Sequence, residues 1–460
     1  MRILILAFEY LPVKVGGLAE AVTSIAENLA ALGNEVWVFT PSHGKHTGEL
    51  VTQFKIRVGG GEEEVRVYER RENNLRVFAL SDNSLDNPDV YGPGWEGLLW
   101  KTVHYAKAST GLLNFLIEKE GRPDVLHFHD WHTVLAGALL KKYFQLPLVF
   151  TLHRLNKGRI PAMYFHEANL SELAPYPEID PEYTGAFISD VVTTVSRSYL
   201  WEEWDFFRNF EGKVTHVFNG IDCSFWNEEL MESKNLPREE RRKLVLQSFG
   251  LEDGVAFMFI GRFDRGQKGV DTLLWAIELL SESNREEFKN LRFIIIGKGD
   301  PALESWAKSL ENKFPENVRV ITEMVNREKV RELYGSVDFV IVPSYFEPFG
   351  LVQMEAMCLG AIPIGSSVGG IKDTIISLDD DVEKATGLLV PPKDAMGLAL
   401  AILRMAKLRN ENPELIKKLR ENGKRRARED FTWRNACIRY LRAYKNEVDK
   451  AVSFLPVSKP

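Results

Sequence analysis

Two basic residues in a glycine-bounded loop give the strongest indication of chemistry in this sequence. Arg262 and Lys268 lie in the segment GRFDRGQKG, residues 261–269. A guanidinium offers two parallel donors and an ammonium offers a compact charge, so together they can bind a diphosphate. In a surrounding of low dielectric, such charges stabilise a departing nucleoside diphosphate without a metal ion. A solvated charged turn is the alternative, and the position directly after a predicted strand argues against it.

The segment SYFEPFGL, residues 344–351, puts a carboxylate in a second loop of this kind. Pro348 and Gly350 disfavour a helix at Glu347, so we expect its carboxylate in the loop that leads into the next helix. Glu355 follows eight residues after Glu347, within that helix. Even on one continuous helix these carboxylates would lie ~12 Å apart along the axis, too far for an acid–base pair. The pattern favours Glu347 as a contact to a sugar and Glu355 as a contact to the ribose of a nucleotide.

A third loop, KVGGL at residues 14–18, follows the first apolar run of the chain. Lys14 supplies a mobile cation, and Gly16 and Gly17 let a ligand approach the backbone where a helix begins. The pattern supports an anion site and a plain loop about equally. It does not predict a P-loop, because no Gly-Lys-Ser or Gly-Lys-Thr follows.

Histidines cluster in the segment HFHDWH, residues 127–132, and His153 follows another apolar run. The cluster suggests a metal site of the metallo-β-lactamase type. Asp130, however, comes one place too early for that pattern, and a zinc site needs further ligands. We therefore expect no metal here and interpret the cluster as structural histidines beside a polar loop. A neutral His153 can hydrogen-bond a substrate hydroxyl, although one histidine at a strand end is by itself more often structural.

Short apolar runs that alternate with longer amphipathic segments must position these loops. Helical patterns include residues 17–32 and 272–280. Strands are predicted over residues 3–8, 35–40, 125–129, 148–152, 191–195 and 215–218, and over residues 256–260, 293–297, 318–321, 339–342, 361–364 and 387–390. Continuous apolar strands that alternate with helices predict α/β architecture, with doubly wound parallel sheets covered on both faces. Ligands bind such sheets outside the carboxyl ends of the strands, where these motifs lie.

The length of 460 residues predicts two domains. We predict a Rossmann-like domain over residues 1–220 and a second one over residues 254–435. Residues 221–253, which include a charge-rich stretch without a predicted strand, are assigned to a linker. Residues 436–460 carry aromatic side chains at helical spacing and are expected to form a helix that can pack back on the first domain.

Composition excludes several classes of protein. The net charge of −7 argues against non-specific nucleic-acid binding, and no apolar run reaches the ~20 residues that a membrane span needs. The apolar start of the chain lacks the pattern of a signal peptide, so we expect a cytoplasmic protein. Cys223, Cys358 and Cys437 are scattered and odd in number. We therefore expect no disulfide framework and a reducing compartment.

Assembled in order, these motifs resemble those of the glycogen and starch synthases, which are retaining glycosyltransferases of the two-Rossmann-domain architecture called GT-B. The resemblance extends from about residue 9 to about residue 374 and includes Lys14-x-Gly-Gly-Leu, His129-Asp-Trp-His, Thr151-Leu-His, Asn219-Gly-Ile-Asp, Arg262 with Lys268, and Glu347-Pro-Phe-Gly-Leu. It implies that the two domains face a cleft that binds a nucleotide-sugar. Val15 stands where bacterial members usually have Thr, and Glu355 is typical of related retaining families. The donor is therefore left open between ADP-glucose and UDP-glucose.

The resemblance also assigns roles to the residues of the second domain. Arg262 and Lys268 would neutralise the leaving diphosphate. Glu347 would contact the donor glucose, with the backbone amides around Gly350 and Leu351.

In the first domain, the resemblance assigns Lys14, Gly16 and Gly17 to the donor phosphates. His153 would reach the glucosyl group at the reacting centre. Glu9 and Asp130 would lie near the acceptor.

The expected reaction is the transfer of glucose from ADP-glucose or UDP-glucose to the non-reducing end of an α-1,4-glucan such as glycogen, with retention at the anomeric carbon and without a metal or other cofactor. A double displacement would need two carboxylates about 5 Å apart, and no such nucleophile is obvious, which favours a same-face substitution. The alternatives are a related retaining transferase that makes a sucrose- or trehalose-type glucoside, a metal-dependent hydrolase built on the histidines, and a silent sugar-binding protein. The oligomeric state is not predicted.

Overall fold

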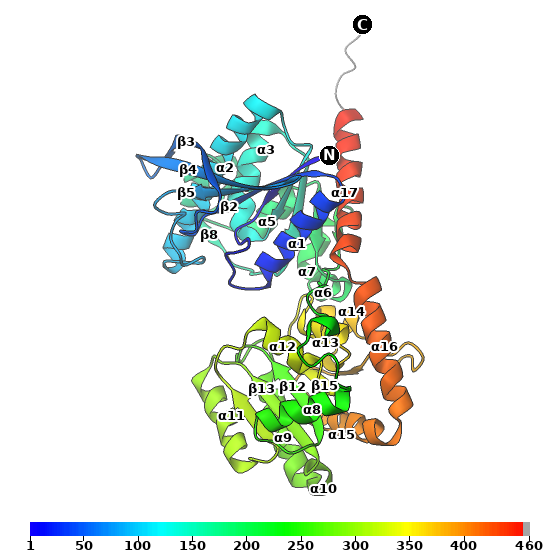
Figure 1. Ribbon diagram of the computed structural model, residues 1–460. Coiled ribbons are helices and arrows are strands. Elements are labelled where there is room, and N and C mark those ends of the chain that lie inside the picture. Colours follow the sequence, from blue (N-terminus) through cyan, green and yellow to red (C-terminus); the bar gives the residue numbers. More distant parts are fainter. Residues whose placement is uncertain (454–460) are drawn as a thin grey trace. The chain divides into compact units, whose positions relative to one another are not determined.

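The computed structural model describes residues 1–453, and the contacts within the chain divide it into two compact units (Figure 1). The first unit comprises residues 1–195 and 203–220 together with the segment that begins at residue 433. The second unit comprises residues 196–202 and 221–432. Within the described residues, no helix has both the length and the apolar character that crossing a membrane requires.

The first unit is built on a sheet with the strand order β11-β10-β7-β6-β1-β2-β5-β4-β3. The strands of this unit are β1 (Arg2–Leu6), β2 (Glu35–Pro41), β3 (Glu49–Val58), β4 (Gly61–Glu72), β5 (Leu75–Ser81), β6 (Val125–His129), β7 (Leu148–Leu152), β10 (Val191–Thr194) and β11 (Val214–His216), with a separate small pair of β8 (Ile160–Pro161) and β9 (Glu178–Ile179). Its helices are α1 (Gly17–Ala31), α2 (Gly94–Glu120), α3 (Val134–Phe144), α4 (Ala162–Glu167), α5 (Pro181–Ile188), α7 (Trp204–Phe207) and α17 (Trp433–Ser453).

Helices cover both faces of this sheet. Ile3 and Ile5 of β1 lie in one apolar cluster with α1 and α17, while Leu4 and Leu6 point to the opposite face and are equally buried. The terminal helix α17 packs beside α1 (Figure 1), and its Tyr440 is part of that cluster. Burial on both faces explains why the central strands are continuously apolar in sequence.

The edge of the sheet differs from the rest. β3 and β4 pair antiparallel, and β4 pairs antiparallel with β5. The sequence pattern did not predict these three strands. In β3 and β4 exposed and buried residues alternate and charged residues are frequent, because one face of this hairpin is open to solvent.

The second unit contains an all-parallel sheet with the order β14-β13-β12-β15-β16-β17. Its strands are β12 (Val255–Ile260), β13 (Leu291–Ile296), β14 (Val318–Ile321), β15 (Phe339–Val342), β16 (Ile362–Ser366) and β17 (Leu388–Val390). Its helices are α6 (Arg197–Glu202), α8 (Arg238–Ser248), α9 (Val270–Ser283), α10 (Arg285–Phe288), α11 (Pro301–Lys313), α12 (Arg327–Tyr334), α13 (Val352–Cys358), α14 (Gly369–Thr374), α15 (Ala395–Glu411) and α16 (Pro413–Glu429). All twelve predicted strands are present in the two units, and the α/β class with two doubly wound sheets is confirmed.

Residues 221–253, predicted as a linker, belong to the second unit and contain α8. Three arginines, from α8, α15 and α16, surround the buried carboxylate of Asp338 within 3.6 Å: Arg242, Arg409 and Arg420. Although burial opposes ionisation, these cations hold the pKa of Asp338 below its usual value. The segment is therefore tied into the second unit by buried ion pairs.

Although the cysteine pattern predicted no disulfide framework, two of the three cysteines pair with each other. Cys223 forms a disulfide with Cys358, the last residue of α13, and their Cα atoms lie 5.9 Å apart. The two residues are 135 positions apart in the sequence, so no local spacing predicts the pair. Cys437 is free and buried against α1.

Candidate functional site

In the second unit, the loop between β12 and α9 is held in shape by one aspartate. Asp264 Oδ1 accepts hydrogen bonds from the backbone N–H groups of Gln267, at 2.6 Å, and Lys268, at 3.0 Å. The Arg262 guanidinium donates to the side chain of Gln267 at 3.2 Å, and about 70% of the Arg262 side chain is exposed. The loop thus presents a largely solvated guanidinium that an anion can reach.

Gly269 ends this loop and cannot be replaced without strain. Its φ of +65° is in the left-handed region, and a Cβ atom there would lie 2.0 Å from the carbonyl oxygen of Pro343. The backbone N–H of Tyr345 also donates to the carbonyl of Gln267 at 2.7 Å. The loop after β12 is therefore packed against the loop after β15.

This packing joins the two charged residues that the sequence separates by 79 positions. Lys268 Nζ lies 2.6 Å from Glu347 Oε2, with 24% of the lysine side chain and 11% of the glutamate side chain exposed. Both residues line a small cavity of about 80 Å³, together with Gly350 and Leu351. Lys268, predicted to bind a diphosphate, and Glu347, predicted to contact a sugar, thus line the same cavity of the second unit.

Glycines hold the Glu347 loop close to its neighbours. Gly350 has a φ of +84°, and a Cβ there would clash with the side chain of Gln353 at 2.6 Å. The Gly370 N–H donates to the Glu347 carbonyl at 3.0 Å, and a Cβ on Gly369 would lie 1.9 Å from that same oxygen. The Val368-Gly369-Gly370 turn therefore positions the backbone that carries Glu347.

Glu355 lies on α13, beyond Leu351, which is the N-cap residue of this helix. Its carboxylate accepts a hydrogen bond from the hydroxyl of Tyr334 at 3.2 Å. Tyr334 is fully buried, and burial together with Glu355 raises its pKa well above the usual value, so the hydroxyl stays protonated and donates. The second carboxylate is thus oriented by α12.

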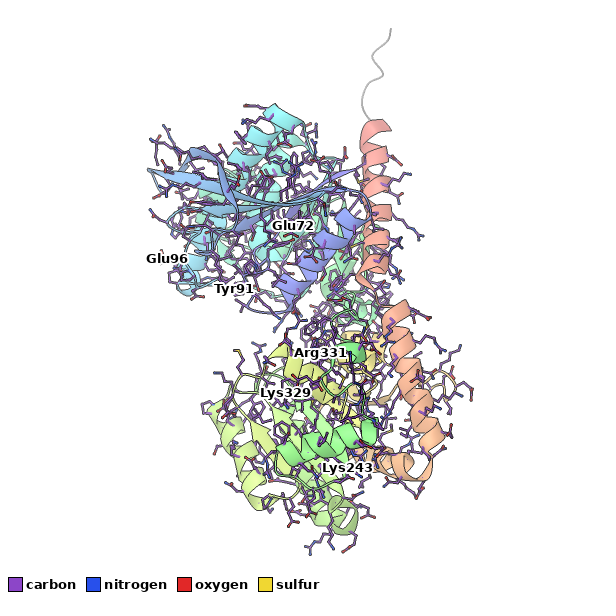
Figure 2. The ribbon with its side chains drawn as sticks, in the orientation of Figure 1. Glu72, Tyr91, Glu96, Lys243, Lys329 and Arg331 are labelled. Atoms are coloured by element: carbon purple, nitrogen blue, oxygen red, sulfur yellow. A yellow bond between two sulfur atoms is a disulfide. The ribbon has the colours of Figure 1, made fainter. Side chains whose placement is uncertain are left out.

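In the first unit, Glu9 organises the loop that precedes α1. Its carboxylate accepts from the backbone N–H groups of Val15, at 2.7 Å, and Gly16, at 3.2 Å, and from the Tyr91 hydroxyl. Tyr91 (labelled in Figure 2) stays protonated, because burial and the Glu9 charge raise its pKa far above the usual value. Glu9 is only 1% exposed. It therefore shapes the glycine loop directly.

Lys14, predicted to be a mobile cation, pairs its ammonium with Glu20 on α1 at 2.7 Å. Gly16 is the N-cap residue and Gly17 the first residue of α1. A Cβ on Gly16 would meet nothing within 4 Å. The space beside Gly16 is thus open, next to a lysine that is paired with Glu20.

Asp130 and His153 follow the neighbouring parallel strands β6 and β7, and they meet at the carboxyl ends of these strands. The His153 N–H donates to Asp130 Oδ1 at 2.7 Å. Burial raises the pKa of Asp130 to about 8 and lowers the pKa of His153 to about 4. Near neutral pH His153 is therefore uncharged, and the φ of 57° at Asp130 marks a strained backbone position that suits a functional loop.

The other histidines of the segment 127–132 contact neighbouring side chains of the protein. Both ring nitrogens of His127 have protein partners, Thr151 at 2.6 Å and Tyr444 at 2.5 Å. His132 stacks on Trp131 at a centroid distance of 4.0 Å. Over residues 1–453, no group of three or more His, Cys, Asp or Glu side chains could hold a metal ion.

Four residues that were not among the predicted site residues complete these surroundings. Glu182 of α5 accepts from the N–H groups of residues 156 and 157 at 2.5 and 2.8 Å and so holds the loop beyond His153. Tyr91, Asp264 and Tyr334 each orient a predicted residue or loop. Only Asp264 gave a signal, since it lies inside the basic loop itself.

Comparison with known proteins defines the class to which these arrangements belong. Residues 2–219 match the family of the starch synthase catalytic domain, and residues 242–426 match the glycosyl transferases group 1. The catalytic domain of starch synthase IV from Arabidopsis thaliana, bound to ADP and acarbose, has the same fold, with a TM-score of 0.82 over 97% of this chain and 99% of that one at 22% identity. The chain is a glycosyltransferase of the GT-B fold.

Relatives along the whole chain narrow this class. Glycogen synthases from Bacillus cereus and Opitutus terrae are 26% and 28% identical, over 97% of this chain and at least 99% of their own lengths. The predicted resemblance to the glycogen and starch synthases is thereby confirmed, and the chain is an enzyme of the glucosyltransferase type.

Proposed function

We propose that this enzyme transfers glucose from ADP-glucose or UDP-glucose to the non-reducing end of an α-1,4-glucan, with retention of the anomeric configuration. The observation that carries the proposal is the Lys268–Glu347 pair on the cavity of the second unit. The loop that holds Lys268 also presents the exposed guanidinium of Arg262. The ADP and acarbose bound to the Arabidopsis starch synthase support a nucleoside diphosphate as leaving group and a saccharide as acceptor.

In this proposal the second unit binds the donor. Arg262 and Lys268 bind the diphosphate and stabilise the charge that develops on it when the bond between the donor glucose and the diphosphate breaks. Glu347 accepts hydrogen bonds from the glucose hydroxyls, helped by the backbone amides of Gly350 and Leu351. Glu355, which Tyr334 orients in this unit, binds the ribose.

The first unit supplies contacts to the sugars and to the donor phosphates. Neutral His153 hydrogen-bonds the transferred glucosyl group, and Glu9 and Asp130 contact the acceptor. Lys14, Gly16 and Gly17 bind the donor phosphates, with Lys14 released from Glu20.

Retention is proposed to follow a same-face substitution, in which the departing phosphate takes the proton of the acceptor hydroxyl. Glu347 is a poor nucleophile for a double displacement, because the Lys268 ammonium lies 2.6 Å from its carboxylate. The charges of Arg262 and Lys268 would take the place of a divalent ion at the diphosphate, so no metal or other cofactor is proposed.

The test is turnover with each nucleotide-glucose against glycogen, following the released diphosphate and growth of the polymer together. Growth of an α-1,4-glucan, insensitive to EDTA, is expected. Arg262→Ala and Glu347→Ala should each reduce transfer by orders of magnitude. Arg265→Ala is the matched control, since Arg265 belongs to the same loop but pairs with Asp300 at 2.8 Å and should leave transfer unchanged.

Other outcomes identify the alternatives. Exclusive formation of a disaccharide from a small acceptor would replace the glucan by a sucrose- or trehalose-type product. Hydrolysis that a chelator abolishes would point to the histidine-based hydrolase, and binding of sugar without turnover would point to a silent binding protein.

The acidic net charge of −7 and the relationship to glycogen synthases support a cytoplasmic enzyme whose partners are its sugar substrates, not nucleic acid or membrane. Cell fractionation with an antibody against the protein tests this proposal.

A further inference from the structure

A row of buried histidines lies behind His153 in the first unit. His127 and His129 are on β6, both are 0% exposed, and their ring centroids lie 4.1 Å apart. His129 Nδ1 lies 3.0 Å from His153 Nε2. One ring nitrogen of His153, Nε2, is therefore engaged with His129.

The terminal helix α17 sets the proton of His127. Tyr444 is fully buried, and burial keeps its pKa well above the usual value, so its hydroxyl donates to His127 Nδ1 at 2.5 Å. The proton of neutral His127 is then on Nε2 and is donated to the Thr151 hydroxyl at 2.6 Å. Burial lowers the pKa of His127 to about 3, so it adds no charge beside His129.

Among the residues that the structure describes, His153 is the partner of one ring nitrogen of His129. The other nitrogen, Nε2, is buried and has no hydrogen-bond partner within that part of the chain. A proton on Nε2 would leave an N–H donor buried without an acceptor, which native proteins avoid more strictly than an unused acceptor. The favoured tautomer of His129 therefore carries its proton on Nδ1 and donates it to His153 Nε2.

This donation decides the tautomer of the next ring. Because His153 Nε2 accepts, the proton of neutral His153 must be on Nδ1. His153 is partly exposed, whereas His129 is not. We infer that His129 is a positioning residue that holds His153 in the Nδ1–H tautomer, so that His153 acts as a hydrogen-bond donor to an oxygen of the sugar. The inference rests on the proposed function for the role of His153, while the tautomer itself does not.

The wild-type protein tests the tautomer without any activity measurement. In full-length protein labelled with ¹⁵N-histidine, the pattern of two-bond nitrogen–proton correlations distinguishes the two tautomers, and the signal of His153 is assigned by its loss in His153→Asn. We expect protonated Nδ1 at His153. Protonated Nε2 in the wild-type protein would overturn the inference.

Substitutions at His129 test the positioning role. Leucine removes the donor, whereas asparagine keeps an N–H donor near the position of Nδ1. In His129→Leu we expect the His153 proton to move at least partly to Nε2. We expect kcat to fall about ten-fold, the effect of losing one hydrogen bond in the transition state, while the KM for glucan is unchanged. His129→Asn should keep the Nδ1–H tautomer of His153 and recover most of kcat.

His166→Asn is the matched control, because His166 is an exposed histidine of the same unit whose Nδ1 contacts Ser171 at 3.0 Å. It should change neither the tautomer of His153 nor kcat. A His129→Leu protein with wild-type kcat would refute the positioning role. If His129→Leu does not fold, the wild-type spectrum and His129→Asn still decide. Absence of glucose transfer in the wild-type enzyme would refute the proposed function and would leave the measured tautomer as it stands.

Discussion

Replacement of Lys268 by alanine should damage both the stability and the activity of this enzyme, and the two effects can be separated. Lys268 is the partner of Glu347 at 2.6 Å, and the glutamate side chain is 11% exposed. Without the ammonium, a nearly buried carboxylate loses its counter-charge. Removing one partner of a fully buried ion pair lowers the free energy of unfolding by about 3–5 kcal/mol. Because about a quarter of the Lys268 side chain is exposed, we expect a loss of about 2–3 kcal/mol.

The catalytic loss has a different origin. If Lys268 stabilises the leaving diphosphate, its removal should lower kcat by roughly 10²–10³, the usual effect of deleting one preorganised electrostatic contact to a transition state. Glu347→Gln keeps an oxygen acceptor for Lys268 and should cost about 1 kcal/mol of stability or less.

The double variant Lys268→Ala/Glu347→Gln separates the loss of stability from the loss of catalytic activity. It leaves no uncompensated charge, so its free energy of unfolding should recover most of the loss seen in Lys268→Ala, whereas kcat should stay low. Chemical denaturation gives the first quantity and glucose transfer to glycogen the second. The control is Lys289→Ala, an exposed lysine of the same unit that pairs with Glu286 on the surface.

Two results would refute this reasoning. A kcat for Lys268→Ala within ten-fold of the wild-type value would show that the ammonium does not stabilise the leaving group. A double variant that is less stable than Lys268→Ala would show that the pair does not compensate the buried charge.

Three further outcomes are expected. Gly269→Ala should lower the free energy of unfolding by at least about 2 kcal/mol in denaturant titrations, because φ is +65° and the added Cβ would lie 2.0 Å from a carbonyl oxygen. Gly266→Ala is the control and should cost much less, because a Cβ there meets nothing within 4 Å. For Asp130, the folded pKa of about 8 lies above the unfolded value near 3.8, so the folded state binds the proton more tightly. The free energy of unfolding of the wild-type protein should therefore fall as pH rises from 4 to 8, by up to about 5 kcal/mol relative to Asp130→Asn. A wild-type protein that instead gains stability over this range relative to Asp130→Asn would contradict the raised pKa. Reductant should lower the thermal unfolding midpoint of the wild-type protein. Reducing the Cys223–Cys358 disulfide opens a loop of 135 residues and returns conformational entropy to the unfolded state, worth about 5 kcal/mol. If reductant lowers the midpoint of Cys223→Ser equally, the disulfide is not the cause of the shift.

Much of the architecture could be predicted because its signals are local. Apolar runs such as that of β12, bounded by glycine loops and followed by helical periodicity, predict a parallel sheet covered on both faces. The same reasoning placed Arg262 and Glu347 in loops at carboxyl ends of strands, where the structure has them. The hairpin of β3 and β4 was missed because its alternating charged residues resemble a surface loop.

Other features left no local trace in the sequence. Tyr91 and Tyr334 each orient a carboxylate from a segment far away in sequence, and no motif indicates either of them. The disulfide joins residues 135 positions apart, and Tyr444 reaches His127 across 317 positions.

Local signals in the sequence indicated the class of fold, twelve of the strands, and the residue types available for diphosphate and sugar chemistry, because periodicity, turn chemistry and charge spacing act over a few residues. Tertiary structure alone decided that Lys268 pairs with Glu347 and Lys14 with Glu20. It also decided the burial that raises the pKa of Asp130 and lowers the pKa of His153. The physical reason is that hydrogen bonds, ion pairs and desolvation depend on distance and burial in space, and these are set by the packing of segments that lie far apart in the chain.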